Sequence, residues 1–190
     1  MVYIIIGPSC AGKSAFVSNS FIRGRTDYKQ YKDIVDITEF DDCILVGKYF
    51  IEDSDINKSR RQGTDNIARQ YINLIKDEIE KHYRYKDIII EGDKICSHSM
   101  MDFVMGLPCE KKLFYVKCSP EESYRRNMNN GSNFSFAHLK ALATKANNIF
   151  IDYCNALNGE IVETEELNDF SKLSKDTFIG LGCSTNGGLW

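Results

Sequence analysis

Short apolar runs alternate with longer segments in which apolar and polar residues follow a helical period. The short runs are rich in isoleucine and valine, as at residues 2–6 and 88–90, which is typical of strands buried on both faces of a sheet. The longer segments repeat apolar residues every three or four positions, as helices that cover a sheet do. We therefore expect an α/β fold with a parallel sheet of about five strands between two layers of helices.

The same pattern sets the approximate bounds of the elements. Strands are predicted at residues 2–6, 34–37, 43–51, 88–90, 113–116 and 161–163. Helices are predicted at residues 13–21, 64–79, 98–106, 119–126, 136–157 and 166–173. Thr64 is expected to cap the second of these helices, and Pro120 suits the first turn of the fourth.

The loop after the first predicted strand carries the most specific signal. Residues 7–14 read GPSCAGKS and fit the pattern G-x-x-x-x-G-K-S of the phosphate-binding P-loop. Glycines let backbone N–H groups turn toward a phosphate, Lys13 would reach the β- and γ-phosphates, and Ser14 would hold Mg²⁺. The alternative is a chance glycine-rich turn. We assign nucleotide binding to Gly7, Pro8, Ser9, Cys10, Ala11, Gly12, Lys13 and Ser14.

Carboxylates that follow the predicted strands are the candidates for metal binding and proton transfer. Glu91 and Asp93 come directly after residues 88–90, and ligands of open α/β sheets bind beyond the carboxyl ends of the strands. Glu91 could order Mg²⁺ through water or accept a proton from an attacking hydroxyl. Asp36, near the end of the second predicted strand, is a rival base. For each of them the alternative is a solvated loop acid.

Two basic segments are candidates for binding phosphate. Arg125 and Arg126 could neutralise charge on a transferring phosphoryl group, and the polar segment that follows would make a lid of about residues 125–135. Neighbouring helical residues do not face the same way, so we expect one of the two arginines to be catalytic and the other solvated. We expect the acceptor site at a second group of residues, Arg60, Arg61, Thr64 and Asp65. The alternative for this group is an exposed basic loop.

Composition narrows the class of protein further. The 190 residues have a net charge of −3, which gives no broad electrostatic footprint for nucleic acid but leaves room for a local basic cleft. We expect one domain over residues 1–175 and a glycine-rich tail, docked or flexible, over residues 176–190. No apolar run could span a membrane, so we expect no membrane partner. The seven cysteines form no C-x-x-C pair, which favours free thiols and a cytoplasmic location, in the host if the protein is viral.

With these motifs in view, the chain resembles the nucleoside monophosphate kinase branch of P-loop proteins, and among them the thymidylate kinase family, over residues 1–175. The resemblance implies the P-loop kinase fold, ATP and Mg²⁺, an arginine-bearing lid and an adenine pocket around residues 164–167. Thymidylate kinases have Asp-Arg where this chain has Glu91-Gly92-Asp93. The layout is also similar to bacteriophage kinases that phosphorylate the hydroxymethyl group of 5-hydroxymethyluracil within DNA.

We therefore expect an ATP-dependent phosphotransferase with a nucleotide-type acceptor, compatible with a homodimer. The departures from the thymidylate kinase pattern favour 5-hydroxymethyl-deoxyuridine in phage DNA, as in thymine hypermodification. The acidic net charge favours the alternative, a free deoxynucleoside monophosphate. A P-loop ATPase or switch without an acceptor is a more distant hypothesis.

Overall fold

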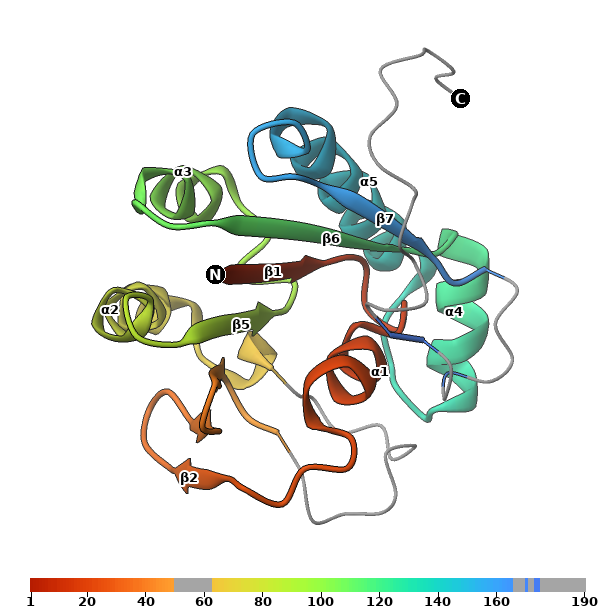
Figure 1. The fold of residues 1–190 in the computed structure, drawn as a ribbon. Helices are drawn as coiled ribbons and strands as arrows, with labels where there is room; N and C mark the ends of the chain where they lie inside the picture. Colours follow the sequence, from red (N-terminus) through yellow and green to blue (C-terminus); the bar gives the residue numbers. More distant parts are fainter. Residues whose placement is uncertain (50–62, 166–169, 171–172, 175–190) are drawn as a thin grey trace.

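A seven-stranded sheet forms the centre of the part of the chain that the structure describes (Figure 1). The structure is a computed structural model, and it describes residues 1–49, 63–165, 170, 173 and 174. The strands are β1 (Val2–Ile6), β2 (Lys29–Tyr31), β3 (Ile37–Glu39), β4 (Cys43–Val46), β5 (Asp87–Glu91), β6 (Lys111–Lys117) and β7 (Glu160–Glu163).

Five of these strands run parallel, as predicted. The order across the sheet is β2-β3-β4-β5-β1-β6-β7, with β4, β5, β1, β6 and β7 parallel to one another. The strands β2 and β3 add an antiparallel extension at one side. Because β1 and β5 are parallel neighbours, the loop that follows β1 and the residues that follow β5 lie at the same edge of the sheet.

Helices cover both faces of the sheet, which gives the expected three layers. Ile4 and Ile6 of β1 pack on one face with helices α2, α3 and α5, whereas Ile5 packs on the other with α1. Helix α4 lies beyond the ends of the strands, as Figure 1 shows. The helices are α1 (Lys13–Val17), which continues as the π-helical turn η1 (Ser18–Ile22), the short helices η2 (Thr64–Asn66) and η3 (Arg69–Tyr71), and α2 (Ile72–His82), α3 (His98–Gly106), α4 (Pro120–Asn129) and α5 (Phe136–Tyr153).

Two predicted elements are wrong. The strand predicted at residues 34–37 is not formed, because Ile34 is exposed and β3 begins only at Ile37. Asp36 therefore precedes a strand instead of ending one. The helix predicted from Thr64 begins at Ile72, since the Thr64 hydroxyl donates a hydrogen bond to the carbonyl of Glu91, 2.7 Å away, and does not cap a helix.

The remaining predictions on the fold have mixed outcomes. The helix predicted at 136–157 ends at Tyr153, and the strand predicted at 43–51 ends at Val46. The tail at 176–190 and all but residues 170 and 173 of the helix predicted at 166–173 lie outside the described residues. Among the described residues, six cysteines are free thiols and no helix is long and apolar enough to cross a membrane.

Candidate active site

The P-loop joins β1 to α1 with backbone angles that depend on glycine. Gly7 has φ +153°, and a Cβ there would lie 2.3 Å from the carbonyl oxygen of Val116 on β6. Gly12 has φ +101°, and Cys10, at +64°, takes the left-handed conformation without being glycine. The loop therefore passes very close to β6, and residues with side chains could not replace Gly7 without moving that strand.

Lys13, at the start of α1, is held inside this loop. The residue as a whole is only 6% exposed. The Nζ atom donates to the carbonyls of Gly7 (3.1 Å) and Pro8 (3.0 Å) and to Oδ1 of Asp93 (2.8 Å). Burial opposes the charge of the ammonium, but the neighbouring carboxylates, that of Asp93 above all, keep the pKa of Lys13 above its ordinary value. Lys13 is therefore a buried cation in an acidic surrounding.

Asp93 is the main partner of Lys13. Its second carboxylate oxygen, Oδ2, accepts a hydrogen bond of 2.6 Å from the hydroxyl of Ser9 in the P-loop. Burial would raise the pKa of Asp93, but the charge of Lys13 and the hydrogen bonds from Lys13 and Ser9 outweigh it and hold the pKa below its ordinary value. The carboxylate is thus ionised and shared between two residues of the P-loop.

Glu91, the last residue of β5, is a buried carboxylate that lacks hydrogen-bond partners within the part of the chain that the structure describes. It is 1% exposed, and neither carboxylate oxygen has a hydrogen-bond partner among the described residues. The hydroxyls of Ser14 and Tyr49 face it, although neither reaches good hydrogen-bond geometry. Burial raises the pKa of Glu91 to about 7, against the opposing effect of Lys13. A buried carboxylate without a partner is costly, which marks this position as one prepared for a ligand.

The segment before α2 lies directly against the end of β5. Oδ1 of Asp65 accepts a hydrogen bond of 2.8 Å from the backbone N–H of Asp93. The approach is so close that a Cβ on Gly92, where φ is +144°, would lie 2.4 Å from the Thr64 hydroxyl. Burial raises the pKa of Asp65. Two segments that are nearly 30 residues apart in sequence are therefore fixed face to face beside the P-loop.

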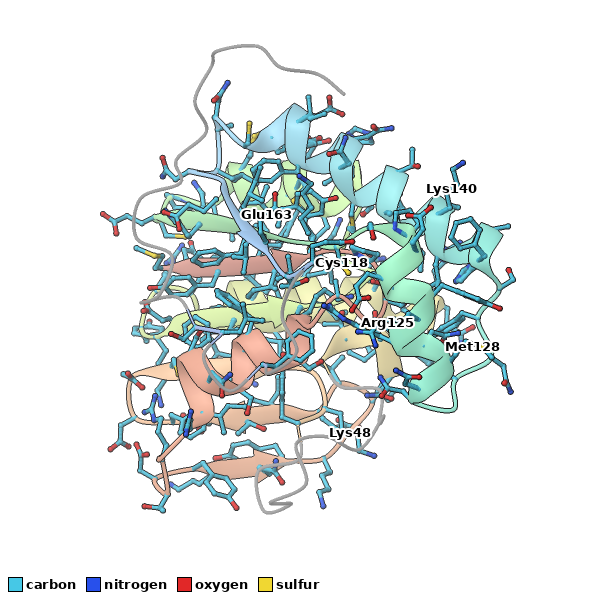
Figure 2. All side chains as sticks on the ribbon, turned by 90° about the vertical axis from the view of Figure 1, so that its right-hand side faces the viewer. Lys48, Cys118, Arg125, Met128, Lys140 and Glu163 are labelled. Carbon is cyan, nitrogen blue, oxygen red and sulfur yellow. The ribbon has the colours of Figure 1, made fainter. Side chains whose placement is uncertain are left out.

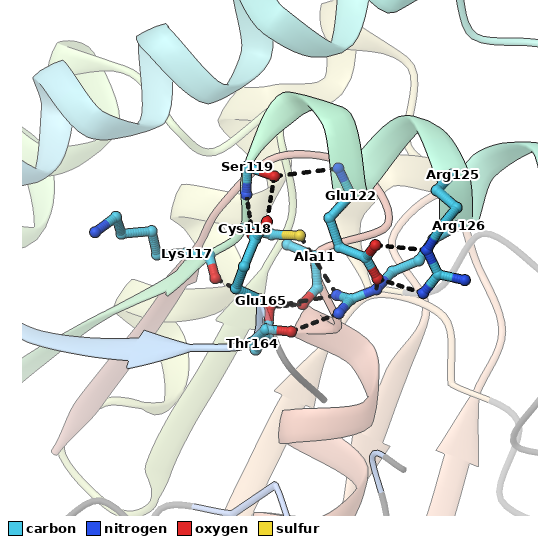
Figure 3. Close-up of polar contacts among 9 residues, drawn as sticks. All are labelled: Ala11, Lys117, Cys118, Ser119, Glu122, Arg125, Arg126, Thr164 and Glu165. Atoms are coloured by element: carbon cyan, nitrogen blue, oxygen red, sulfur yellow. Dashed lines mark hydrogen bonds and ion pairs between the residues drawn. The ribbon is translucent and has the colours of Figure 1, made fainter. Parts of the chain in front are cut away.

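On α4, the two neighbouring arginines have different environments (Figure 3). Arg126 is buried, and its Nη1 lies 3.4 Å from both the Thr164 hydroxyl and the Cys118 sulfur, while Nε donates to Glu122 at 2.7 Å. The Thr164 hydroxyl lies 2.9 Å from the carbonyl of Ala11 in the P-loop. Arg126 thus connects α4 to the residue after β7 and, through it, to the P-loop.

Arg125 faces outward from the same helix. Its side chain is 56% exposed, and its Nε and Nη2 each donate to Glu122 at 2.6 Å. Figure 2 shows the side of the molecule that lies on the right in Figure 1, and Arg125 and Lys48 are labelled on this side. A surface ion pair of this kind contributes little stability, so Arg125 can exchange Glu122 for a phosphate at small cost.

The structure brings together some of the predicted site residues and separates others. Lys13, Ser14 and Asp65 lie close enough to Glu91 to affect its pKa, whereas Thr64 uses its hydroxyl to bind the end of β5. The start of β3 pairs with the end of β4, so Asp36 lies two strands away from β5, and it is not among the strongest charges acting on Lys13. Arg60 and Arg61 lie outside the described residues.

Sequence reasoning gave too little weight to three residues. The sequence offers Asp93 as a candidate without a role of its own, yet it is the residue that binds Lys13 and Ser9. Tyr49 lies in the strand predicted at residues 43–51 and is buried, but its hydroxyl faces Glu91. Thr164 was implied only by the resemblance, as part of an adenine pocket. The position of Asp93 two residues after a buried strand was the available signal, whereas nothing local in the sequence marks the other two.

The P-loop motif implies Mg²⁺, and the residues present fit it. Among the described residues, no three His, Cys, Asp or Glu side chains are arranged to hold a metal ion by themselves. Kinases bind Mg²⁺ through one or two protein groups together with phosphate oxygens and water, so a complete protein cage is not required. The Glu91 carboxylate, without a partner and beside the Ser14 hydroxyl, supplies the oxygen ligands that Mg²⁺ prefers.

Comparison with known proteins finds distant likeness among solved structures. No protein-family model matches the chain, and no curated protein is significantly similar to it in sequence. Among solved structures, the chain is similar to deoxyadenosine kinase from M. mycoides with bound dATP, at 11% identity. The match covers 91% of this chain and 95% of that chain, with a TM-score of 0.48. At this identity and this TM-score, the likeness carries no argument for the fold or for the activity.

Proposed function

We propose that the chain is an ATP-dependent P-loop kinase that transfers the γ-phosphate of ATP to a hydroxyl of a nucleotide-type acceptor. The observation that carries the proposal is the pairing of a complete P-loop with a buried carboxylate that has no partner. Glu91 lies beside Ser14 and within the field of Lys13, where the reacting groups of a phosphoryl transfer would meet.

The roles follow from the chemistry of the groups. The backbone of the P-loop and Lys13 would bind the β- and γ-phosphates. Ser14 would hold Mg²⁺ directly and Glu91 would hold it through water, and Mg²⁺ when bound neutralises charge on those phosphates. The acceptor oxygen attacks the γ-phosphorus, the bond from that phosphorus to the bridging oxygen breaks, and ADP leaves. The proton of the acceptor hydroxyl passes to Glu91.

Glu91 is better suited than Asp36 to take this proton. Its pKa of about 7 lets a carboxylate both remain ionised near neutral pH and hold a proton in the transition state. Its position at the end of β5, next to β1, puts it beside the P-loop, whereas Asp36 belongs to the antiparallel side of the sheet. Arg125, exposed and paired only with Glu122 among the contacts described above, is the arginine we assign to the transferring phosphoryl group.

The acceptor is proposed at the segment that contains Asp65, which faces the end of β5. Of the acceptors considered from the sequence, 5-hydroxymethyl-deoxyuridine in DNA stays our first prediction and the free deoxynucleoside monophosphate the alternative. Incubation with labelled ATP, Mg²⁺ and each acceptor in turn separates them by where the label appears. Label in mononucleotides alone would eliminate the DNA prediction, and ATP hydrolysis unaffected by every acceptor would favour an ATPase.

Removal of the P-loop lysine tests the proposal itself. Lys13→Ala alone would leave the buried Asp93 without its main partner, so the test uses the double variant Lys13→Ala with Asp93→Asn. We expect phosphoryl transfer to fall by about 10³-fold or more while the double variant keeps a cooperative unfolding transition. Lys81→Ala, which changes an exposed lysine of α2, is the control. Near-normal transfer by the double variant would show that the assigned role of Lys13 is wrong.

A further inference from the structure

All three N–H bonds of the P-loop lysine are engaged. The acceptors of the Lys13 ammonium are the carbonyls of Gly7 and Pro8 and the carboxylate of Asp93, at 3.1, 3.0 and 2.8 Å. Two of these belong to the loop itself, and Asp93 is the acceptor that carries a full charge. For Lys13 to bind a phosphate oxygen, one of these contacts has to be released or shared.

The same carboxylate also engages a second donor of the loop. Oδ2 of Asp93 accepts from the Ser9 hydroxyl at 2.6 Å while Oδ1 accepts from Lys13. Both donors are polar groups of the P-loop, and charge-assisted hydrogen bonds of this kind are the ones a phosphate oxygen would make. In this structure, Asp93 therefore acts as an anion bound to the P-loop side chains.

Hydrogen bonds to its backbone hold Asp93 in this position. Its backbone N–H donates to Oδ1 of Asp65 at 2.8 Å, and its carbonyl accepts from Lys145 at 3.2 Å. Gly92 before it has φ +144° and no space for a Cβ, because the Thr64 hydroxyl would be 2.4 Å away. The backbone on this side of the loop is therefore fixed, and a competing anion must displace the carboxylate side chain or bind next to its charge.

The charge around Lys13 is unfavourable for a bare anion. Asp93, Asp65 and Glu91 all act on the ammonium, strongly enough to overcome the effect of its burial. These carboxylates repel a further negative charge that is placed close to them. A metal-free polyphosphate brings several such charges, whereas a magnesium-bound triphosphate brings fewer.

We propose that Asp93 is a specificity-determining residue, which competes with bare phosphate anions for Lys13 and Ser9 and so makes the P-loop select a magnesium-bound triphosphate. This inference rests on the proposed function, in that the P-loop binds a nucleoside triphosphate. The species it excludes are inorganic phosphate, tripolyphosphate and the metal-free nucleotide.

Calorimetric titration measures the selectivity directly and does not depend on phosphoryl transfer. ATP and tripolyphosphate are each titrated into the whole protein, with excess Mg²⁺ or with a chelator, for the wild type, Asp93→Asn and Asp77→Asn. Asn has the same shape without the charge, and Asp77 is an exposed residue of α2, so its variant controls for net charge alone. We expect Asp93→Asn to tighten metal-free binding of both probes by about tenfold or more, and Asp77→Asn to change it little.

A second variant protects the test against loss of stability in the first. Asp93→Ser also removes the charge but keeps an oxygen that can accept a hydrogen bond from Lys13, so it should shift metal-free binding in the same direction. Metal-free binding that is unchanged in both folded variants overturns the role of Asp93. Absence of any binding of ATP with Mg²⁺ to the wild type overturns the proposed function and this inference together. Normal selectivity without transfer to any acceptor overturns the proposed function alone.

Discussion

Arg125 and Arg126 show at the residue scale how two consecutive positions of one helix can have two chemical roles. Both guanidinium groups contact Glu122, but Arg126 is 7% exposed and also contacts the backbone carbonyl of Thr164 and the ring of Phe170. Arg125 is mostly exposed. The buried face of α4 consists of polar residues, Ser123, Arg126 and Asn127. Hydrophobic periodicity gives no signal for such a face, which is why the sequence could not distinguish the two arginines.

Alanine at Arg125 should affect the rate of transfer, whereas alanine at Arg126 should affect stability. Arg125→Ala should reduce kcat about 10²-fold, because it removes one donor to the transferring phosphate, and should leave the midpoint of thermal unfolding within a few degrees of wild type. Arg126→Ala leaves its buried partners unsatisfied and should lower the free energy of unfolding by about 3 kcal/mol. Steady-state kinetics and urea unfolding of both variants check this. A large kinetic loss in a fully stable Arg126→Ala protein would reverse the assignment.

At the element scale, the loop at Gly63 and η2 that follows it depend on contacts with β5. Thr64 resembles an N-cap because a threonine hydroxyl before an apolar period usually binds its own helix. Here the hydroxyl binds the end of β5, and α2 starts eight residues later. Strand β2 is not predicted from the sequence for a different reason. All three of its residues are exposed, so they show no pattern of alternating burial. By contrast, the buried strand β1 and helix α3 have the predicted bounds.

Two glycines with positive φ allow the effect of packing in this loop to be separated from the effect of backbone strain. Gly63 has φ +64°, and a Cβ there would lie 2.4 Å from Cγ of Glu91, whereas Gly24 has φ +79° and nothing within 4 Å. Alanine at Gly24 should lower the free energy of unfolding by about 1 kcal/mol through backbone strain alone. Alanine at Gly63 adds overlap with β5 and should lower it by about 3 kcal/mol. Urea unfolding measures both, and equal losses would mean that the loop adjusts freely.

At the scale of the whole molecule, the class of fold could be predicted and the pairings inside the site could not. Parallel strands and a P-loop place the reactive groups at one edge of the sheet, which is why Lys13 and Glu91 could be named from the sequence. The contacts of Asp93 with Ser9 and Lys13 span 84 and 80 residues. They depend on the register of β1 against β5 and on a glycine turn, which no local pattern encodes.

The pH dependence of global stability reports on Glu91. The folded protein keeps the pKa of Glu91 at about 7, above the ordinary value of 4.5, so the folded state binds more protons than the unfolded state between these values. The stabilising contribution is therefore complete below about pH 4.5 and is lost as the pH rises through 7. At about 1.4 kcal/mol per pKa unit, the loss amounts to up to about 3 kcal/mol.

Glu91→Gln removes this dependence because its amide does not titrate. Without nucleotide or Mg²⁺, the free energy of unfolding of the wild type should fall relative to Glu91→Gln by up to about 3 kcal/mol between pH 5 and pH 8. Urea unfolding at several pH values measures the difference, with Asp77→Asn as the control for loss of an exposed carboxylate. Asp93, whose pKa is lowered, titrates below this range and adds no slope within it. Parallel curves for wild type and Glu91→Gln would mean that the carboxylate is solvated and ionised throughout, and Glu91 would lose its place as the proton acceptor.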